Sequence, residues 1–506
     1  MSDEPGALRG RRSVALSAIA EAVGGEVVTP TDTSSPPNAV PHVHVTDVVH
    51  SSTGVPVGAL FVAVRGARTD GHEHAADAVD AGAAALLVDH ELPIPVPQIV
   101  VADTRAAMAL AAAACWGSPS LELAVVGVTG TNGKTTVVSL VDGILRGVGS
   151  PAEVIGTLTG VRTTPEATDL QPLLRDAVDR GVEVVAMEVS SHALELHRVD
   201  GIRFAVAAFT NLGVDHLDFH GTQERYFEAK ARLFDTARSD VAVVNVDDVR
   251  GRLLRDAAPA DRPVVGCSIE DLDDVVIGPT GSGFTWRSQR VSLPLVGRFN
   301  VSNALIAAEI CVALGHDPQA VAPALSATTA PPGRLEPVVA GQPYEIFVDY
   351  AHTPDGLAEV LATARELTTG RLIVVLGAGG DRDTSKRPRM GEVACRLADV
   401  VVITSDNPRS EDPSAIIAAV RAGCVEGEPV TEIDRRTAIG VALDAAGPGD
   451  VVVIAGKGHE VTQTIGERIL DFDDRVVARA LLADRGWVGP GGADSPAAGG
   501  AGGPLS

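Results

Sequence analysis

Positive charge is what this chain has too little of. Its 506 residues include 41 Lys and Arg against 66 Asp and Glu, which gives a net charge of −25. This acidic balance argues against an extended nucleic-acid surface, because nucleic-acid phosphates are bound by an excess of basic side chains. Any anionic ligand must be met by a local basic cluster. The chain also lacks an apolar run long enough to cross a bilayer. We expect no nucleic-acid partner and no membrane span.

Cysteine is scarce as well. The five cysteines are scattered, at Cys115, Cys267, Cys311, Cys395 and Cys424. Their spacing suggests neither a zinc site nor a disulfide framework, and it fits a reducing compartment. Arg11-Arg12 before an apolar stretch imitates a twin-arginine export signal, but Glu21 interrupts that stretch. We therefore expect an amphipathic first helix in a soluble, cytoplasmic protein.

Apolar runs alternating with helical stretches are abundant, and they predict an α/β fold. Runs such as 183–188, 204–209 and 241–246 are almost uninterrupted, which is typical of a parallel sheet covered on both faces. The length suggests about three domains. Breaks near 116–120 and 331–333 place an N-terminal domain at 13–118, a central domain at 119–332 and a C-terminal doubly wound domain at 333–488. We expect the Gly- and Pro-rich tail at 489–506 to be disordered.

The most informative feature is a glycine-rich turn between an apolar strand and a helix, Gly130-Thr131-Asn132-Gly133-Lys134-Thr135-Thr136. In such a turn backbone N–H groups surround phosphate oxygens, Lys134 reaches the β- and γ-phosphates, and the Thr135 hydroxyl can bind Mg²⁺. The strict P-loop pattern is not met, since Val128 stands where it requires glycine. The strand-to-helix context disfavours the alternative, a glycine turn with a surface lysine.

Two polar segments follow later strands of the same predicted sheet. Glu188 ends one strand, and at the carboxyl edge of the sheet it would lie beside the nucleotide, where a second Mg²⁺ ligand is needed. The loop 210–221 after another strand contains Asp215, His216, Asp218 and His220. Such a cluster suggests metal or phosphate chemistry, with a solvated polar loop as the alternative.

Lys230 lies on the apolar face of a predicted helix, shared with Tyr226, Phe227, Leu233 and Phe234. An ammonium on an apolar stripe is unfavourable unless it reaches solvent. It can also react with CO₂ to form a carbamate, whose anionic oxygens suit Mg²⁺. The residues alone favour a lysine that extends to solvent.

Seven motifs in order give the chain a resemblance to the Mur ligase family. They are Gly-Thr-Asn-Gly-Lys-Thr-Thr at 130–136, Met-Glu-Val-Ser-Ser-His-Ala-Leu at 187–194, Asn-Leu-Gly-Val-Asp-His-Leu-Asp-Phe-His-Gly at 211–221, Ala-Lys-Ala-Arg-Leu-Phe at 229–234, Gly-Arg-Phe-Asn-Val-Ser-Asn-Ala-Leu at 297–305, Pro-Gly-Arg-Leu-Glu at 332–336 and Asp-Tyr-Ala-His-Thr-Pro at 349–354. The resemblance implies an N-terminal UDP-binding domain, a central P-loop ATPase domain and a C-terminal Rossmann-like domain that binds the incoming amino acid.

The resemblance also implies roles for individual residues. The ATP-binding set is Gly130, Thr131, Asn132, Gly133, Lys134, Thr135, Thr136, Asn300, Asn303, Arg334 and Asp349. The catalytic set is Lys134, Glu188, His216 and Lys230. In the metal-binding set, Thr135 with Glu188 would hold one Mg²⁺, and His216 with a carbamylated Lys230 would hold another. The set that binds a UDP-muramoyl dipeptide is Ser51, Thr163, Thr164, Ser190, Arg198 and Lys230.

Within the family the chain most resembles members that add the third residue of the peptidoglycan stem peptide. That resemblance implies ATP as co-substrate, Mg²⁺ as cofactor and UDP-N-acetylmuramoyl-L-alanyl-D-glutamate as acceptor. The γ-phosphate would pass to the D-glutamate side-chain carboxylate, and the amine of an amino acid would then displace phosphate. Domain closure would exclude water from the acyl phosphate. We expect a monomer.

The motif Asp406-Asn407-Pro408-Arg409 indicates which amino acid is added. It matches family members that use meso-diaminopimelate, because a guanidinium can pair with the distal carboxylate that lysine lacks. By resemblance the same pocket includes Arg382, Gly456 and Glu460. The alternative is that Asp-Asn-Pro-Arg is only a turn that starts a helix.

The sequence also departs from the family pattern and leaves other interpretations open. His50-Ser51-Ser52-Thr53 stands where the family usually has Asp-Ser-Arg, which puts the uridine contacts of that loop in question. Other interpretations are the same ligase adding L-lysine, another amide ligase of the family, and a non-catalytic binding protein. A switch GTPase is more remote, since Asp218-Phe219-His220-Gly221 fits one of its elements but no guanine-reading motif is present.

Overall fold

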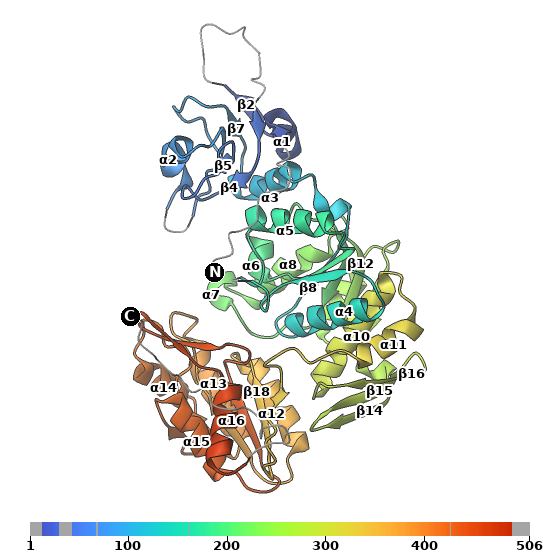
Figure 1. Cartoon of the computed structure of the whole chain (residues 1–506), viewed down its shortest axis with the longest axis vertical. Helices are drawn as coiled ribbons and strands as arrows, with labels where there is room; N and C mark the ends of the chain where they lie inside the picture. The colour runs from blue at the N-terminus through green and yellow to red at the C-terminus, as the bar shows by residue number, and fades with distance from the viewer. Residues whose placement is uncertain (1–12, 30–42, 67–68, 161, 426, 488–506) are drawn as a thin grey trace, which may run out of the picture. The chain divides into compact units, whose positions relative to one another are not determined.

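The computed structural model describes residues 13–29, 43–66, 69–160, 162–425 and 427–487, so Arg11-Arg12 and the tail at 489–506 lie outside the described residues. The chain forms two compact units. The first comprises the residues up to 212 together with 222–268 and 303–327, and the second comprises 213–221, 269–302 and the residues from 328 onward. Both units are α/β, as predicted (Figure 1).

The N-terminal part of the first unit is a small five-stranded sheet in the order β2-β7-β6-β5-β4. Its strands are parallel except for the β2–β7 pair, which is antiparallel. The expected amphipathic first helix is present, with Leu16, Ile19 and Ala20 buried. The bounds are β1 (Val14–Ala15), α1 (Leu16–Val23), β2 (Glu26–Val28), β3 (His44–Val45), β4 (Val48–Val49), β5 (Leu60–Val62), α2 (Ala75–Asp80), β6 (Ala85–Val88), β7 (Gln98–Val100) and α3 (Thr104–Cys115).

The larger sheet of the first unit is parallel throughout, in the order β13-β12-β11-β8-β10-β9. Its strands are apolar and almost fully buried because helices cover both faces, with α5 and α6 on one side and α4 on the other (Figure 1). The bounds are β8 (Ala124–Thr129), α4 (Lys134–Gly147), β9 (Ala152–Ile155), α5 (Ala167–Asp179), β10 (Val184–Glu188), α6 (Ser191–Glu195), β11 (Phe204–Phe209), α8 (Gln223–Ala231), β12 (Ser239–Asn245), α9 (Val249–Asp256), β13 (Val264–Cys267) and α11 (Pro318–Ser326).

The second unit is built on a six-stranded sheet in the order β17-β18-β22-β19-β20-β21, parallel except for β17. Helices α12, α13 and α14 pack on one face, and α15 and α16 pack on the other. The bounds are β17 (Glu336–Pro337), β18 (Glu345–Asp349), α12 (Pro354–Leu367), β19 (Leu372–Leu376), α13 (Lys386–Leu397), β20 (Val400–Ile403), α14 (Pro413–Arg421), β21 (Val430–Thr431), α15 (Arg435–Ala445), β22 (Val451–Ala455) and α16 (Asp474–Asp484).

Two antiparallel pieces of the second unit were not predicted from the sequence. One is a three-stranded sheet of β14 (Asp273–Gly278), β15 (Gly281–Trp286) and β16 (Gln289–Leu293). The other is a hairpin of β23 (Thr462–Ile465) and β24 (Arg468–Asp471). The unit also contains α7 (Leu217–His220), and α10 (Arg298–Ala313) begins in it and continues into the first unit.

The cysteines depart from the sequence prediction. Cys395 at the end of α13 and Cys424 just after α14 form a disulfide, with their Cα atoms 5.5 Å apart. The two positions are separated by 29 residues, and only the packing of α13 against α14 brings them together. The expectation that no disulfide framework is present was therefore wrong for this pair. Cys115, Cys267 and Cys311 are buried and lie outside this disulfide.

Candidate functional site

The glycine-rich turn connects β8 to the first turn of α4, as expected. Gly130 has φ 152° and Gly133 has φ 86°. A Cβ at Gly130 would collide with the Thr210 hydroxyl, and a Cβ at Gly133 would collide with the Asn303 amide oxygen. Glycine is therefore required at both positions, for its backbone conformation and for the lack of space. The turn precedes the first residues of α4, and the N-terminus of a helix favours an anion.

The turn is braced by the loop that follows β11. Thr131 N donates to Asn211 O at 2.9 Å, and Asn132 N donates to Asn211 Oδ1 at 2.9 Å. Thr210 Oγ1 donates to Asn132 O at 2.5 Å. These contacts hold the backbone of the turn before any ligand binds, which lowers the entropic penalty of binding.

Glu188 and Thr135 lie together at the carboxyl edge of the sheet. The Thr135 hydroxyl donates to Glu188 Oε2 at 3.1 Å, and Thr157 N donates to Glu188 Oε1 at 2.7 Å. Glu188 is 1% exposed. A hydroxyl and a carboxylate beside a phosphate-binding turn are the hard oxygen ligands that Mg²⁺ prefers, so these residues fit the predicted metal site.

Lys230 does not extend to solvent, so the interpretation that its helix pattern favoured was wrong. The side chain is 1% exposed and turns inward from α8 over the Tyr226 ring, 4.5 Å from its centroid. Its Nζ donates to Gly130 O at 2.7 Å. Lys134 Nζ donates to the same oxygen at 2.9 Å, and also to Thr131 O at 2.9 Å. Two ammonium groups thus converge on one carbonyl of the phosphate turn, where a shared anion would relieve their repulsion.

Most of the residues predicted to grip a muramoyl dipeptide lie together around Thr164. Its hydroxyl donates to Glu188 O at 2.9 Å and accepts from Ser190 N at 3.0 Å. Arg198 NH1 donates to Thr164 O at 3.0 Å. The Thr163 hydroxyl lies 3.2 Å from that of Thr157. The arrangement connects this candidate subsite to the backbone of Glu188 through Thr164, and to the Glu188 carboxylate through Thr163 and Thr157.

Ser51 stands apart from that group. It lies in the loop after β4, where its hydroxyl is 3.2 Å from Thr53 N in a local turn. His50 beside it contacts α5 through Thr168 Oγ1 at 3.0 Å, and burial lowers the pKa of His50. The altered 50–53 loop therefore has its own local packing, which the sequence did not indicate.

Sequence reasoning missed a charged cluster next to Arg198. The buried carboxylate of Glu166 pairs with Arg198 at 2.9 Å and with Arg162 at 2.8 Å, and Arg105 lies 3.7 Å away. A signal was available, because Glu166 follows Thr163-Thr164-Pro165 directly. The partly buried Arg198 is oriented by this carboxylate rather than by neighbours in sequence.

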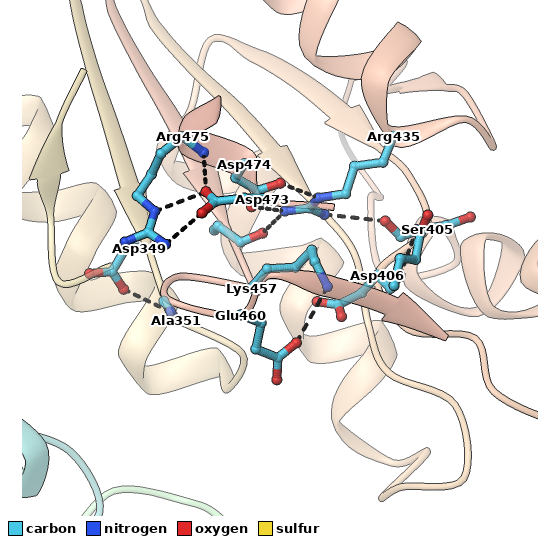
Figure 2. Close-up of polar contacts among 12 residues, drawn as sticks. Asp349, Ala351, Ser405, Asp406, Arg435, Lys457, Glu460, Asp473, Asp474 and Arg475 are labelled. Carbon is cyan, nitrogen blue, oxygen red and sulfur yellow. Dashed lines mark hydrogen bonds and ion pairs between the residues drawn. The ribbon is translucent and has the colours of Figure 1, made fainter. Parts of the chain in front are cut away.

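The other predicted ATP residues are distributed along the chain. Asn300 is fully buried and donates to Val296 O at 2.8 Å, whereas Asn303 packs against Gly133. In the second unit Asp349 accepts from Leu335 N and Ala351 N, both at 2.7 Å, and burial raises its pKa (Figure 2). Arg334 lies over the Tyr350 ring, 4.7 Å from its centroid.

His216 belongs to the second unit. It has φ 55° at the start of α7, and its Nε2 lies 3.3 Å from Asp215 Oδ2. Burial alone would raise the pKa of Asp215, but His216, His352 and Lys386 outweigh it, so that pKa lies below its usual value. A histidine held by a carboxylate suits a metal ligand, and this role stays a prediction.

The residues predicted to bind the amino acid do come together. They lie at the carboxyl ends of β19, β20 and β22. Asn407 Nδ2 donates to Glu460 Oε2 at 2.7 Å, and Arg409 NH1 donates to Gly380 O at 2.7 Å. A Cβ at Gly379 would lie 3.0 Å from Arg409 NH1 and 3.7 Å from Arg382 Cγ, so both arginines border that glycine. A Cβ at Gly456 would lie 2.6 Å from Asp406 Oδ2.

The interpretation of Asp-Asn-Pro-Arg as a helix start is wrong, because α14 begins at Pro413 and is capped by Asp412. Instead β23 holds this loop in place. Arg409 N donates to Thr464 O at 3.0 Å, and Gln463 Nε2 donates to Asp406 O at 2.7 Å. Arg409 itself has φ 50°, a conformation that a non-glycine residue adopts only when its surroundings enforce it.

Among the described residues, no helix is long and apolar enough to span a membrane.

Comparisons with known proteins converge on one family. Three family models match: the Mur ligase middle domain over residues 128–311, the Mur ligase glutamate ligase domain over 333–458 and the Mur ligase family catalytic domain over 44–115. Together they match well over half of the chain.

Relatives and solved structures agree with these matches. The chain is 46% identical over 462 residues to UDP-N-acetylmuramoyl-L-alanyl-D-glutamate–2,6-diaminopimelate ligase of Geobacillus kaustophilus, covering 86% of this chain and 94% of that protein. It is 46% identical over 470 residues to the protein of the same name from Streptomyces avermitilis, covering 87% and 92%. A solved structure of an enzyme with this name is similar with a TM-score of 0.65 and 31% identity, over 94% of this chain and 100% of that one.

Proposed function

Because this chain belongs to the Mur ligase family, we propose that it joins meso-diaminopimelate to UDP-N-acetylmuramoyl-L-alanyl-D-glutamate with ATP as co-substrate. The observation that carries this function is the 46% identity to a 2,6-diaminopimelate ligase over 94% of that relative. The structure supports this function through the Asp-Asn-Pro-Arg loop. Arg409 donates to Gly380 O, and Asn407 of the same loop donates to Glu460, so the proposed pocket residues lie together.

ATP would bind at the turn that precedes α4. The N–H groups of that turn and Lys134 would hold its phosphates, with Asn303 beside Gly133. Thr135 and Glu188 would hold a Mg²⁺ ion, and His216 with a carbamylated Lys230 would hold a second. These ions would screen the negative charge of the phosphates and of the carboxylate that approaches them.

The reaction follows from the charges. An oxygen of the D-glutamate side-chain carboxylate attacks the γ-phosphorus, ADP leaves and an acyl phosphate forms. The amine of the amino acid then attacks the acyl carbon, loses a proton and displaces phosphate. Lys134 stabilises the negative charge that develops on the transferred phosphoryl group. Thr164, Ser190 and Arg198 orient the acceptor next to Glu188.

Carbamylation of Lys230 is supported by the crowding at Gly130 O. Lys134 and Lys230 both donate to this oxygen. When the Lys230 ammonium loses a proton, its amine can add CO₂ and release a second proton, which gives a carbamate. This change replaces a positive charge with a negative one, so it would remove the repulsion and would add an oxygen ligand for Mg²⁺.

The amino-acid pocket has the charges that a zwitterion requires. Arg409 would pair with the distal carboxylate of meso-diaminopimelate, and Glu460 would accept a hydrogen bond from its distal ammonium. Arg382, Asp406 and Gly456 would complete the pocket. L-Lysine has the ammonium but lacks the carboxylate, so it would leave Arg409 without a partner.

The domain boundaries at 118/119 and 332/333 belong to the same proposal, with a UDP-binding N-terminal domain that includes Ser51. We also propose a cytoplasmic location, because the three substrates of the reaction are nucleotides, nucleotide-linked or small metabolites, and we propose that the protein is a monomer.

Phosphate release from ATP tests the function directly. Purified protein, Mg²⁺ and the UDP-muramoyl dipeptide are assayed with meso-diaminopimelate or with L-lysine, and the product mass is measured. Release and a tripeptide product with meso-diaminopimelate alone are expected. Equal turnover with L-lysine would favour the lysine-adding function and overturn the role of Arg409. No product with either amino acid would indicate another amide ligase of the family.

A further inference from the structure

Lysine occurs at only four positions of this chain, 134, 230, 386 and 457, and arginine supplies all its other basic side chains. Lys134 and Lys230 lie at the phosphate turn. None of the roles proposed above uses Lys386 or Lys457. A lysine retained among so many arginines marks a position that suits a compact ammonium rather than a planar guanidinium.

Lys457 is the more deeply buried of the two unassigned lysines. It follows β22 in the turn Ala455-Gly456-Lys457-Gly458, and its side chain is 0% exposed. A buried ammonium is strongly unfavourable unless several acceptors surround it. The acceptors that surround Lys457 therefore indicate its role.

Those partners are two residues of the proposed pocket and one strand of the hairpin. Lys457 Nζ donates to Thr462 O at 2.6 Å, and it lies 3.4 Å from both Asn407 Oδ1 and Glu460 Oε2. Figure 2 shows its side chain extending to Glu460. One ammonium thus connects the loop after β20, the loop after β22 and β23.

The contacts fix how Asn407 and Glu460 are oriented. Asn407 Oδ1 accepts from Thr464 N at 2.9 Å as well as from Lys457, so its Nδ2 must point the other way, and it donates to Glu460 Oε2 at 2.7 Å. All hydrogen bonds of the Glu460 side chain to described residues go to Oε2. Oε1 is therefore the oxygen left for a ligand.

A second buried cation holds the backbone behind the same loops. Arg435 pairs with Asp474 at 2.7 Å, and both side chains are fully buried (Figure 2). Its guanidinium also donates to Ser405 O at 3.2 Å and to Ala455 O at 3.0 Å. These carbonyls directly precede Asp406 and Gly456. With the backbone held by Arg435, the remaining freedom lies in the side chains that Lys457 contacts.

We propose that Lys457 is a positioning residue of the amino-acid pocket, whose ammonium holds Asn407 and Glu460 so that Glu460 Oε1 is presented to the ammonium of the incoming amino acid. The proposal rests on the pocket proposed above. Lys457 acts through Glu460 and does not itself touch the substrate.

The test is Lys457→Met, which removes the charge but keeps a long side chain. We expect KM for meso-diaminopimelate to rise ~10-fold or more, because a hydrogen bond to a charged group is lost. KM for ATP and for the UDP-muramoyl dipeptide should stay within ~2-fold. Arg468→Met, which removes one exposed positive charge from the same hairpin, is the matched control and should leave all three constants unchanged. An unchanged KM for meso-diaminopimelate, or an equal rise in all three constants, would overturn the proposal.

A double-mutant cycle with Glu460→Gln separates positioning from general damage. If Lys457 works through Glu460, then Lys457→Met adds less than ~2-fold to KM in the Glu460→Gln background. Full multiplication of the two effects would overturn the proposal while leaving the pocket intact. If Glu460→Gln alone leaves KM for meso-diaminopimelate unchanged, the pocket assignment itself fails.

Lys457→Arg tests the same role should the methionine variant not fold. It keeps the buried charge, but its guanidinium cannot take the same place between Asn407 Oδ1 and Thr462 O. We expect a folded enzyme with a raised KM for meso-diaminopimelate alone. An unchanged KM would show that a guanidinium serves there as well as an ammonium, and would overturn the requirement for the ammonium of Lys457.

Discussion

The phosphate turn and the amino-acid pocket are built in opposite ways. The proposed phosphate-binding turn is one contiguous segment, 130–136, whose conformation requires glycine at positions 130 and 133. The pocket is assembled from the ends of β19, β20 and β22 and from the hairpin β23–β24. Two buried cations lie behind it: Arg435 bonds backbone carbonyls of its loops, and Lys457 contacts the side chains of Asn407 and Glu460.

The difference has a functional consequence. A phosphate group is bound in the same way in many proteins, so a local backbone motif is sufficient. One amino acid must instead be distinguished from another of almost equal size, and this requires charged side chains held rigidly at fixed separations. Changes at the phosphate turn should therefore lower kcat, whereas changes in the pocket should raise KM for one substrate.

The largest effect is expected for a variant at the phosphate turn. Lys230→Ala removes both the ammonium at Gly130 O and any carbamate, and kcat should fall ~10³-fold because charge stabilisation in the transition state is lost. Short carboxylic acids added to the assay should restore part of the rate by supplying the missing anionic oxygen. A variant that keeps kcat within ~3-fold would remove Lys230 from the catalytic set.

The second largest effect is expected on stability, and it concerns Glu359, a partly buried carboxylate on α12 outside both regions. Burial, together with Asp349 and Asp355, raises the pKa of Glu359 to about 7 from 4.5. The folded state therefore holds a proton that the unfolded state releases, and stability is lost as pH rises from 4.5 to 7. Glu359→Gln should stabilise the protein by about 3 kcal/mol at pH 8 and by almost nothing at pH 4. Thermal unfolding at both pH values measures this, and equal shifts would contradict the cause given.

The variant Arg409→Lys tests the amino-acid pocket. Lysine keeps the charge but loses the planar pair of donors, so KM for meso-diaminopimelate should rise ~30-fold. KM for ATP should not change, and the preference for meso-diaminopimelate over L-lysine should shrink. Steady-state kinetics with each substrate varied in turn checks this. A rise of the same size in KM for ATP would contradict the conclusion that changes in the pocket affect only one substrate.

The smallest effect concerns a motif residue that binds nothing in the site. Thr353 in Asp-Tyr-Ala-His-Thr-Pro is the N-cap of α12, where its hydroxyl accepts from Gly356 N at 3.2 Å. Thr353→Ala should lower the unfolding free energy by about 1 kcal/mol and leave every KM unchanged. Serine, which can also cap, should restore the stability. A change in kcat without loss of stability would instead assign Thr353 to the site.

The local sequence pattern predicted the structure well where a feature is formed by one contiguous segment. The apolar runs at 183–188, 204–209 and 241–246 predicted β10, β11 and β12, and the glycine-rich segment was correctly placed between a strand and a helix. The helical pattern gave a wrong prediction for Lys230, which does not extend to solvent. The spacing of apolar residues along one helix contains no information about Gly130 O, the acceptor that the fold brings to Lys230. It failed also for Cys395 and Cys424, which meet only through the packing of two helices.

The α/β class, the glycine-rich turn and the family resemblance could all be predicted from the chain, because each of them depends on the order of nearby residues. The side chains that hold the proposed pocket could not be predicted, because segments far apart in the chain bring them together. Arg435, Lys457 and Thr464 are distant from Asn407 along the chain, yet they surround the loop that bears it. Buried charges must be satisfied by whichever acceptors the fold brings near, and those partners are set by strand order and helix packing rather than by spacing in the sequence.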